Sequence, residues 1–228
     1  MRPRILAIET SSERCSVALE TETALYSLES EQPRGHADLI LQMVQDVIAD
    51  SGLELEQLDA LAYSKGPGAF TSIRIGISVV QGLAFGRSLS VASASSLEVM
   101  AHKFRAQEGR IIMPSLDARM SEVYFGVYII QNGRAVSLQT DQVAKPELIQ
   151  LDTTIDLNQV ICVGSGWQSY AKEMAEKFKH LNVVKEAECY PHAKDLLDIA
   201  YAQYSENILL PADQILPVYI RDNVTHGS

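Results

Sequence analysis

Short apolar runs and helical stripes alternate along the first half of the chain. The runs are bounded by polar residues, which predicts three strands in a meander and a fourth strand further along. Residues 36–49 are apolar at three- and four-residue spacing, which predicts a helix, and residues 72–85 form a second predicted helix that is apolar on most of its circumference. The predicted strands cover residues 5–8, 16–19, 24–28 and 58–64.

The second half repeats this order of elements. Its apolar runs predict another three-stranded meander, in which Asn132-Gly133 is a strong hairpin signal, and helices and strands then alternate as before. The two halves therefore predict an α/β protein of two related lobes, residues 1–107 and 108–228, with a last helix or tail that can pack back on the first lobe. The predicted strands cover residues 110–116, 123–130, 135–138, 160–164 and a segment near 183, and the predicted helices cover 146–150, 168–178 and 193–205.

A glycine-proline loop, KGPGAFTSIRIG at residues 65–76, joins the fourth predicted strand to the second helix. Pro67 and Gly68 suit a type II turn in which Gly68 takes a positive φ, and Thr71 or Ser72 can cap the helix. Such a loop presents backbone N–H groups to an anion, and Lys65 or Arg74 lies close in sequence, so a phosphate site is one interpretation. A plain structural turn explains the same residues.

Composition narrows the possible partners. The chain has 228 residues, of which 46% are hydrophobic, and a formal net charge of −10. Binding to nucleic acid needs clustered Lys and Arg, so we expect any contact with RNA to be indirect. The cysteines lack metal or redox spacing, which favours reduced thiols. The sequence has neither a signal-peptide core nor the roughly 20 apolar residues of a membrane span, which predicts a cytoplasmic protein that binds no membrane.

Four segments carry a resemblance to a known family. They are ILAIETSSERCSVAL (residues 5–19), KGPGAFTSIRIG, SLDARMSEVY (residues 115–124) and PVYIRD (residues 217–222). In this order and at this spacing they resemble the TsaB family, also called YeaZ. The resemblance implies a two-lobed, actin-like (ASKHA) α/β fold with a mixed sheet in each lobe. It also implies a non-catalytic scaffold that activates its relative TsaD in threonylcarbamoyl transfer to adenosine 37 of ANN-decoding tRNAs.

The first predicted helix lacks the metal-binding pair of the catalytic relative. The resemblance implies that TsaD-type proteins carry His-x-x-x-His on one face of this helix. Here His36 is followed at that spacing by Ile40. We therefore expect no metal site and no tightly bound cofactor in this chain. ATP and metal are expected on the partner subunits, which the resemblance gives as a TsaD-type paralogue and a TsaE-type small ATPase in a ternary complex.

A vestigial phosphate site is the main candidate for small-molecule binding. The superfold usually places Asp and Gly at the first turn of each lobe, but residues 9–11 and 117–119 contain no glycine. We interpret Glu9 and Asp117 as strand-end residues. The alternative is a nucleotide-dependent kinase or hydrolase that holds a phosphate in the interlobe cleft. The residues of this candidate site are Glu9, Thr10, Ser11, Gly66, Gly68, Thr71, Arg74 and Asp117.

The two long helices of the first half offer more apolar area than one thin lobe easily covers. Such an area usually marks a partner site, and the resemblance implies that TsaB and TsaD pair through these helices, and that TsaB alone pairs with itself there. A Val44→Glu substitution is then expected to block pairing. The alternatives are that both helices simply pack on their own sheet, or that they serve only a homodimer. The predicted partner-binding residues are His36, Leu39, Ile40, Met43, Val44, Val47, Ile73, Ile77 and Val80.

Overall fold

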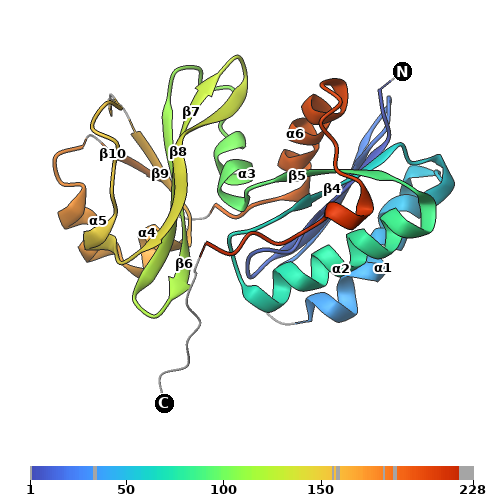
Figure 1. Cartoon of the computed structure of the whole chain (residues 1–228), viewed down its shortest axis with the longest axis horizontal. Coiled ribbons are helices and arrows are strands. Elements are labelled where there is room, and N and C mark those ends of the chain that lie inside the picture. The colour runs from blue at the N-terminus through green and yellow to red at the C-terminus, as the bar shows by residue number, and fades with distance from the viewer. Residues whose placement is uncertain are drawn as a thin grey trace.

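Two five-stranded mixed sheets form the centres of two lobes that lie side by side (Figure 1). The computed structural model describes residues 2–32, 35–155, 157, 160–181, 183–186 and 189–220. Within these residues, no helix combines the length and apolar character needed to cross a membrane. The end of the PVYIRD segment and the tail His226-Gly227-Ser228 lie outside the described residues.

The first lobe has the strand order β3-β2-β1-β4-β5. Its first three strands form an antiparallel meander, and β4 and β5 then add in parallel to β1. A parallel addition needs a crossover, and here α1 and α2 supply the crossovers. The elements are β1 (Ile5–Glu9), β2 (Cys15–Glu20), β3 (Leu25–Ser30), α1 (His36–Ser51), η1 (Leu55–Gln57), β4 (Ala60–Ser64), α2 (Phe70–Arg87), β5 (Ser90–Ala94) and α3 (Ser96–His102).

The second lobe repeats this topology with the order β10-β9-β6-β7-β8. Asn132 and Gly133 form the two-residue turn between β7 and β8, both with positive φ, which confirms the predicted hairpin. The shared meander-plus-parallel topology confirms the predicted two-lobed, actin-like α/β fold. The elements are β6 (Ile111–Arg119), β7 (Glu122–Gln131), β8 (Arg134–Ala144), η2 (Pro146–Leu148), β9 (Val160–Val163), α4 (Ser165–Ser169), α5 (Ala171–Lys177), β10 (Val183–Glu186), α6 (Ala193–Ser205) and η3 (Ala212–Gln214).

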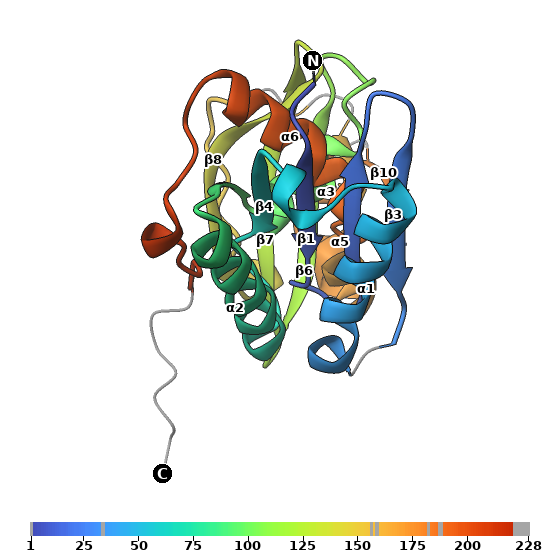
Figure 2. The same cartoon turned by 90° about the vertical axis from the view of Figure 1, so that its right-hand side faces the viewer.

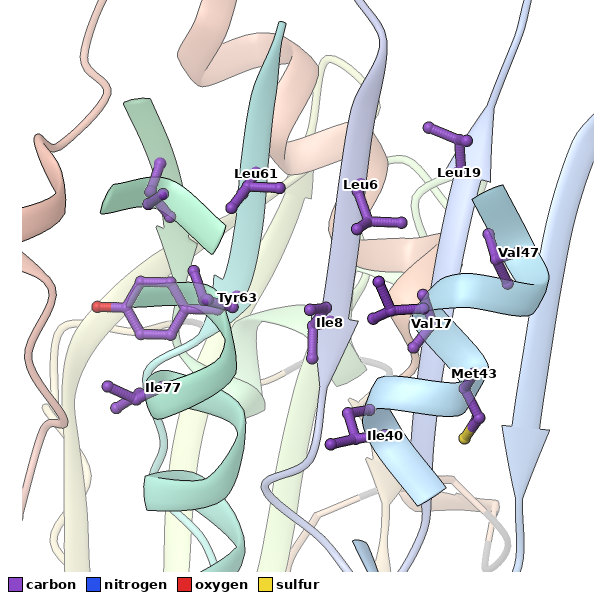
Figure 3. Close-up of a cluster of buried hydrophobic side chains, with 14 of the residues drawn as sticks. Leu6, Ile8, Val17, Leu19, Ile40, Met43, Val47, Leu61, Tyr63 and Ile77 are labelled. Carbon is purple, nitrogen blue, oxygen red and sulfur yellow. The ribbon is translucent and has the colours of Figure 1, made fainter. Parts of the chain in front are cut away.

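Helices cover both faces of the first sheet. On one face, side chains of α1 and α2 pack into a cluster with β1, β2 and β4, and Figure 3 shows Ile40, Met43, Val47 and Ile77 among them. On the other face, α6 returns from the second half of the chain, and its Leu196 and Leu197 pack against the small side chains of β1, β4 and β5. Residues 208–220, here called the C-terminal strap, then run over the first lobe beside α2 (Figure 2).

A strand and an α-helix of the first lobe were absent from the sequence prediction, as was the short η1. Strand β5 has the sequence SVASA, whose small side chains give no strong apolar run, and α3 has seven residues, too few for a helical period to be evident. Helix α3 nevertheless connects the lobes, because Leu97 and Met100 are buried in a cluster with Ile112 and Tyr128 of the second sheet. Strand β8 extends well beyond the predicted residues 135–138, since an edge strand with exposed side chains gives little apolar signal.

Candidate functional site

A cleft of about 420 Å³ lies between the lobes and is the first of two candidate sites. The loop after β1 and the glycine-proline loop line it from the first lobe, and the β6–β7 hairpin and α4 line it from the second. Of the predicted loop-site residues, the cleft brings together Ser11, Gly68 and Asp117. The lining is rich in hydroxyl groups and includes Ser12, Ser165, Ser169, Tyr124 and Tyr190.

Glu9 lies beneath this cleft and is fully buried at the end of β1. Its Oε1 accepts hydrogen bonds from the backbone N–H of Ser11 (2.6 Å) and from the Ser11 hydroxyl (2.5 Å). Burial raises the pKa of the Glu9 carboxyl above its ordinary value of 4.5, because desolvation penalises the charged form, and the hydrogen bonds from Ser11 oppose this effect only in part. Through Oε1, the Glu9 carboxyl thus holds the turn after β1.

Asp117 reaches the cleft but is already engaged. Its Oδ1 accepts hydrogen bonds from the Arg119 backbone N–H (2.8 Å) and the Tyr170 hydroxyl (3.1 Å). Its Oδ2 lies 3.3 Å from Nη1 of Arg119. The second terminal nitrogen of Arg119 reaches across the cleft to Glu13 of the first lobe. Asp117 and Glu9 thus differ in burial and in partners, and of the two it is Asp117 that lines the cleft.

The glycines of the KGPGAFTSIRIG segment serve close backbone packing. The positive φ lies at Gly66 (+97°) and not at Gly68, so the predicted type II turn is wrong. Gly68 is required for a different reason: a Cβ there would lie 2.0 Å from the Ser11 carbonyl oxygen. The Ala69 N–H donates to that same oxygen (2.8 Å). The Ala69 amide therefore holds the β1–β2 turn. A bound phosphate would need the same amide.

Thr71 and Arg74 lie apart from the cleft. Helix α2 begins at Phe70 with Ala69 as its N-cap residue, so Thr71 is inside the first turn and does not cap the helix. Thr71 and Arg74 line a separate notch of about 410 Å³ on the outer side of the lobe. Thr10 packs under α2 and donates to the Ser72 carbonyl oxygen (2.8 Å). The predicted loop-site residues therefore divide among several places in the first lobe.

The predicted partner-binding side chains point mostly into the lobe. In Figure 3, Ile40, Met43 and Val47 of α1 and Ile77 of α2 point toward the sheet. Val44 is only 4% exposed, so Val44→Glu would place a charge in the core. Its effect on pairing could not be separated from its effect on folding. Leu39 is partly buried, and the remaining predicted residues, His36, Ile73 and Val80, are buried. These side chains pack on their own sheet.

The surface of the same two helices is formed by their neighbours in sequence. Leu41, Phe70 and Phe85 are 52%, 50% and 63% exposed. Figure 2 shows α1 and α2 side by side on the outside of the first lobe. We call this surface the outer helix face; it comprises Leu41, Phe70 and Phe85 with the partly buried Ile75, Val79 and Leu83. The sequence signal for it was the apolar character of α2 around most of its circumference.

No group of three or more His, Cys, Asp or Glu side chains is placed to hold a metal ion within the described part of the chain. His36 is buried at the start of α1, and its Nε2 lies 3.3 Å from the carbonyl oxygen of Glu13. The residue one turn later, Ile40, packs in the core. His36 thus contacts the β1–β2 turn from the start of α1.

Comparisons with known proteins agree with this architecture. A family model described as TsaD, tRNA N6-adenosine threonylcarbamoyltransferase, matches residues 30–227. The TsaB protein of Escherichia coli K12, a tRNA threonylcarbamoyladenosine biosynthesis protein, is 38% identical over 97% of this chain and 96% of its own length. Its counterpart in Haemophilus influenzae is 34% identical, over 97% and 94%. The structure of YeaZ from Pseudomonas aeruginosa superposes with a TM-score of 0.87 at 37% identity, covering 95% of this chain and 99% of that one. The chain therefore belongs to the TsaB family of tRNA threonylcarbamoyladenosine biosynthesis proteins.

Proposed function

We propose that this chain is a non-catalytic activator that docks on a TsaD-type transferase through the outer helix face. The observation that carries this proposal is the exposure of Leu41, Phe70 and Phe85 on two adjacent helices whose inner sides are already buried. Large apolar side chains grouped on one surface usually mark a protein interface. The reaction it supports is threonylcarbamoyl transfer to adenosine 37 of ANN-decoding tRNAs.

The cleft supports a non-catalytic role. A pair of carboxyl groups that shares acid and base chemistry must reach the same substrate. Glu9 is fully buried and bonded to Ser11, and Asp117 is held by Arg119 and Tyr170. Both groups make structural contacts, and Glu9 is not among the residues that line the cleft. The transferring group, ATP and any metal then belong to the partner subunits.

Docking acts by changing the conformational equilibrium of the catalytic subunit. A partner shifts such an equilibrium only when it binds one state more tightly than the other. The outer helix face is built on two helices fixed by a well-packed core, so it offers a rigid template for the active state. A TsaE-type ATPase joins the assembly, and the catalytic subunit makes most of the contacts with tRNA. In the absence of its partners the chain pairs with itself.

The test is a reconstituted transfer reaction with every other pathway component present. Its arms contain the wild-type chain, no chain, Leu41→Glu or Leu148→Glu. Leu148 is 62% exposed and lies in η2 of the second lobe, so it is a matched control for the same substitution away from the proposed interface. Pull-down of the catalytic subunit is measured in parallel.

We expect no transfer without the chain and equal transfer with the wild type and with Leu148→Glu. Leu41→Glu should support neither transfer nor pull-down. A charge in the centre of an apolar interface is costly, so the loss should exceed about tenfold. Full transfer without the chain would refute the activator role. Equal activity of the two Glu variants would place the interface elsewhere.

A further inference from the structure

Arg74 is held in a fixed position on the outer side of α2 by two aromatic rings. Its guanidinium carbon lies 3.7 Å from the ring centroid of Phe70 and 5.6 Å from that of Tyr219. The two rings contact one another, with centroids 5.3 Å apart. Nε of Arg74 donates a 2.7 Å hydrogen bond to the Tyr219 hydroxyl. An exposed arginine usually samples many rotamers, so this arrangement removes much of the entropy that binding would otherwise cost.

The C-terminal strap places Tyr219 in this arrangement. The strap is tied to the first lobe by backbone bonds, including Val218 N–H to the Lys65 carbonyl oxygen (2.8 Å). The Tyr63 hydroxyl donates to the Leu216 carbonyl oxygen (3.1 Å), and the Gln81 side chain donates to that of Ile215 (2.9 Å). In Figure 2 the strap descends along α2 on the side away from α1. The strap thereby extends the outer helix face.

Arg74 has no acidic partner within the described residues, although the chain contains 29 acidic and 19 basic residues. Its two terminal nitrogens make no hydrogen bond to the described residues, since the bond to Tyr219 uses Nε. The side chain lines the notch between α1 and α2, together with Thr71, Ser78 and Val79. A guanidinium held in this way, with no acidic partner among the described residues, is suited to a bidentate bond with a carboxylate.

We propose that Arg74 binds a carboxylate of the docked TsaD-type subunit, and that Phe70 and Tyr219 preorganise it for this contact. The proposal rests on the proposed function. The overall charge counts against a second copy, because that copy carries the same formal net charge of −10 and two such chains repel each other. Asp38 and Asp46 of α1 are exposed on the same helix, and Asp46 accepts a 2.8 Å bond only from the neutral Gln42 side chain, so both carboxylates keep their charge. Pairing of Arg74 with these groups of a second copy is therefore an alternative outcome of the test.

The test is the dissociation constant of the purified catalytic subunit for full-length variants at low and high salt. Arg74→Gln should weaken binding by about 10- to 100-fold at low salt and reduce the salt dependence of the affinity. Arg74→Lys keeps the charge but loses the planar fork, and Tyr219→Phe loses only the hydroxyl, so both should fall in between. Arg134→Gln, which removes an exposed arginine of the second lobe paired with Glu206, should bind as the wild type does.

Leu41→Glu separates this proposal from the proposed function. If Arg74→Gln bound with wild-type affinity while Leu41→Glu lost binding, the role of Arg74 would be overturned and the activator role would stay intact. Wild-type affinity of both variants would refute both. If Arg74→Gln weakened only self-association, the carboxylate contact would be overturned in favour of a second copy. If the variant bound the catalytic subunit normally but lost cross-linking to tRNA, the contact would be overturned in favour of a phosphate.

Discussion

Nη2 of Arg119 lies 3.0 Å from Oε1 of Glu13, and this ion pair bridges the two lobes at the interlobe cleft. Nη1 of the same guanidinium lies 3.3 Å from Oδ2 of Asp117. The positive charge of Arg119 is thus shared by two carboxylates that line the cleft. A nucleotide triphosphate entering this space would meet Glu13 and Asp117 and would have to displace Arg119 from both.

We therefore predict that the isolated chain hydrolyses ATP no faster than buffer does. Asp117→Asn is expected to leave this background unchanged, because Asp117 positions Arg119 and Tyr170 and activates no water. A phosphate-release assay at high protein concentration measures both. Turnover that rises with the concentration of the chain and disappears in Asp117→Asn would instead establish the kinase or hydrolase alternative.

Gly68→Ala should destabilise the chain by about 2 kcal/mol or more, because the new Cβ would lie 2.0 Å from the Ser11 carbonyl oxygen and backbone cannot easily give way. Gly82→Ala is the matched control. It lies in α2 with no atom within 4 Å of an added Cβ, and should stabilise by about 0.5–1 kcal/mol. Urea unfolding at low protein concentration measures both. Similar midpoints for the two variants would contradict the close approach of loop and turn.

Val44→Glu and Leu41→Glu should differ in stability although the two positions are only three apart in the sequence. Val44 is 4% exposed in the core of the first lobe, so a glutamate there should cost at least about 3 kcal/mol. Leu41 is 52% exposed, and the same substitution should change stability by less than about 0.5 kcal/mol. Thermal unfolding of the two purified variants gives the comparison. A large loss for Leu41→Glu would mean that its side chain is needed for folding.

Glu9→Gln should stabilise the chain at neutral pH and little below pH 4.5. Burial raises the folded-state pKa of Glu9 above 4.5, so the folded chain holds this proton more tightly than the unfolded chain does. The wild type therefore loses stability as the pH rises from 4.5 through the folded-state pKa. Other titrating groups are common to both proteins, so the difference between their unfolding free energies isolates Glu9. A pH-independent difference would contradict this assignment.

The strand and helix pattern of this chain was largely determined by local sequence. Apolar runs predicted both meanders and the parallel strands β4, β9 and β10, and Asn132-Gly133 predicted the β7–β8 hairpin, because these signals depend on neighbouring residues. Elements made of small or polar residues, such as β5 and the far end of β8, escaped prediction because their stability comes from strand pairing and not from their own composition.

Only the tertiary structure decided which residues of one helix face the core and which face solvent. Val44 and Leu41 are both apolar residues of α1, yet one is buried against the sheet and the other is half exposed, since the direction of a side chain depends on where the sheet lies. In the same way, the C-terminal strap brings Tyr219 to Arg74 across 145 positions of sequence. The sequence by itself determined most of the elements and the family, but contacts between distant segments decided the surface, because packing is a property of the assembled chain.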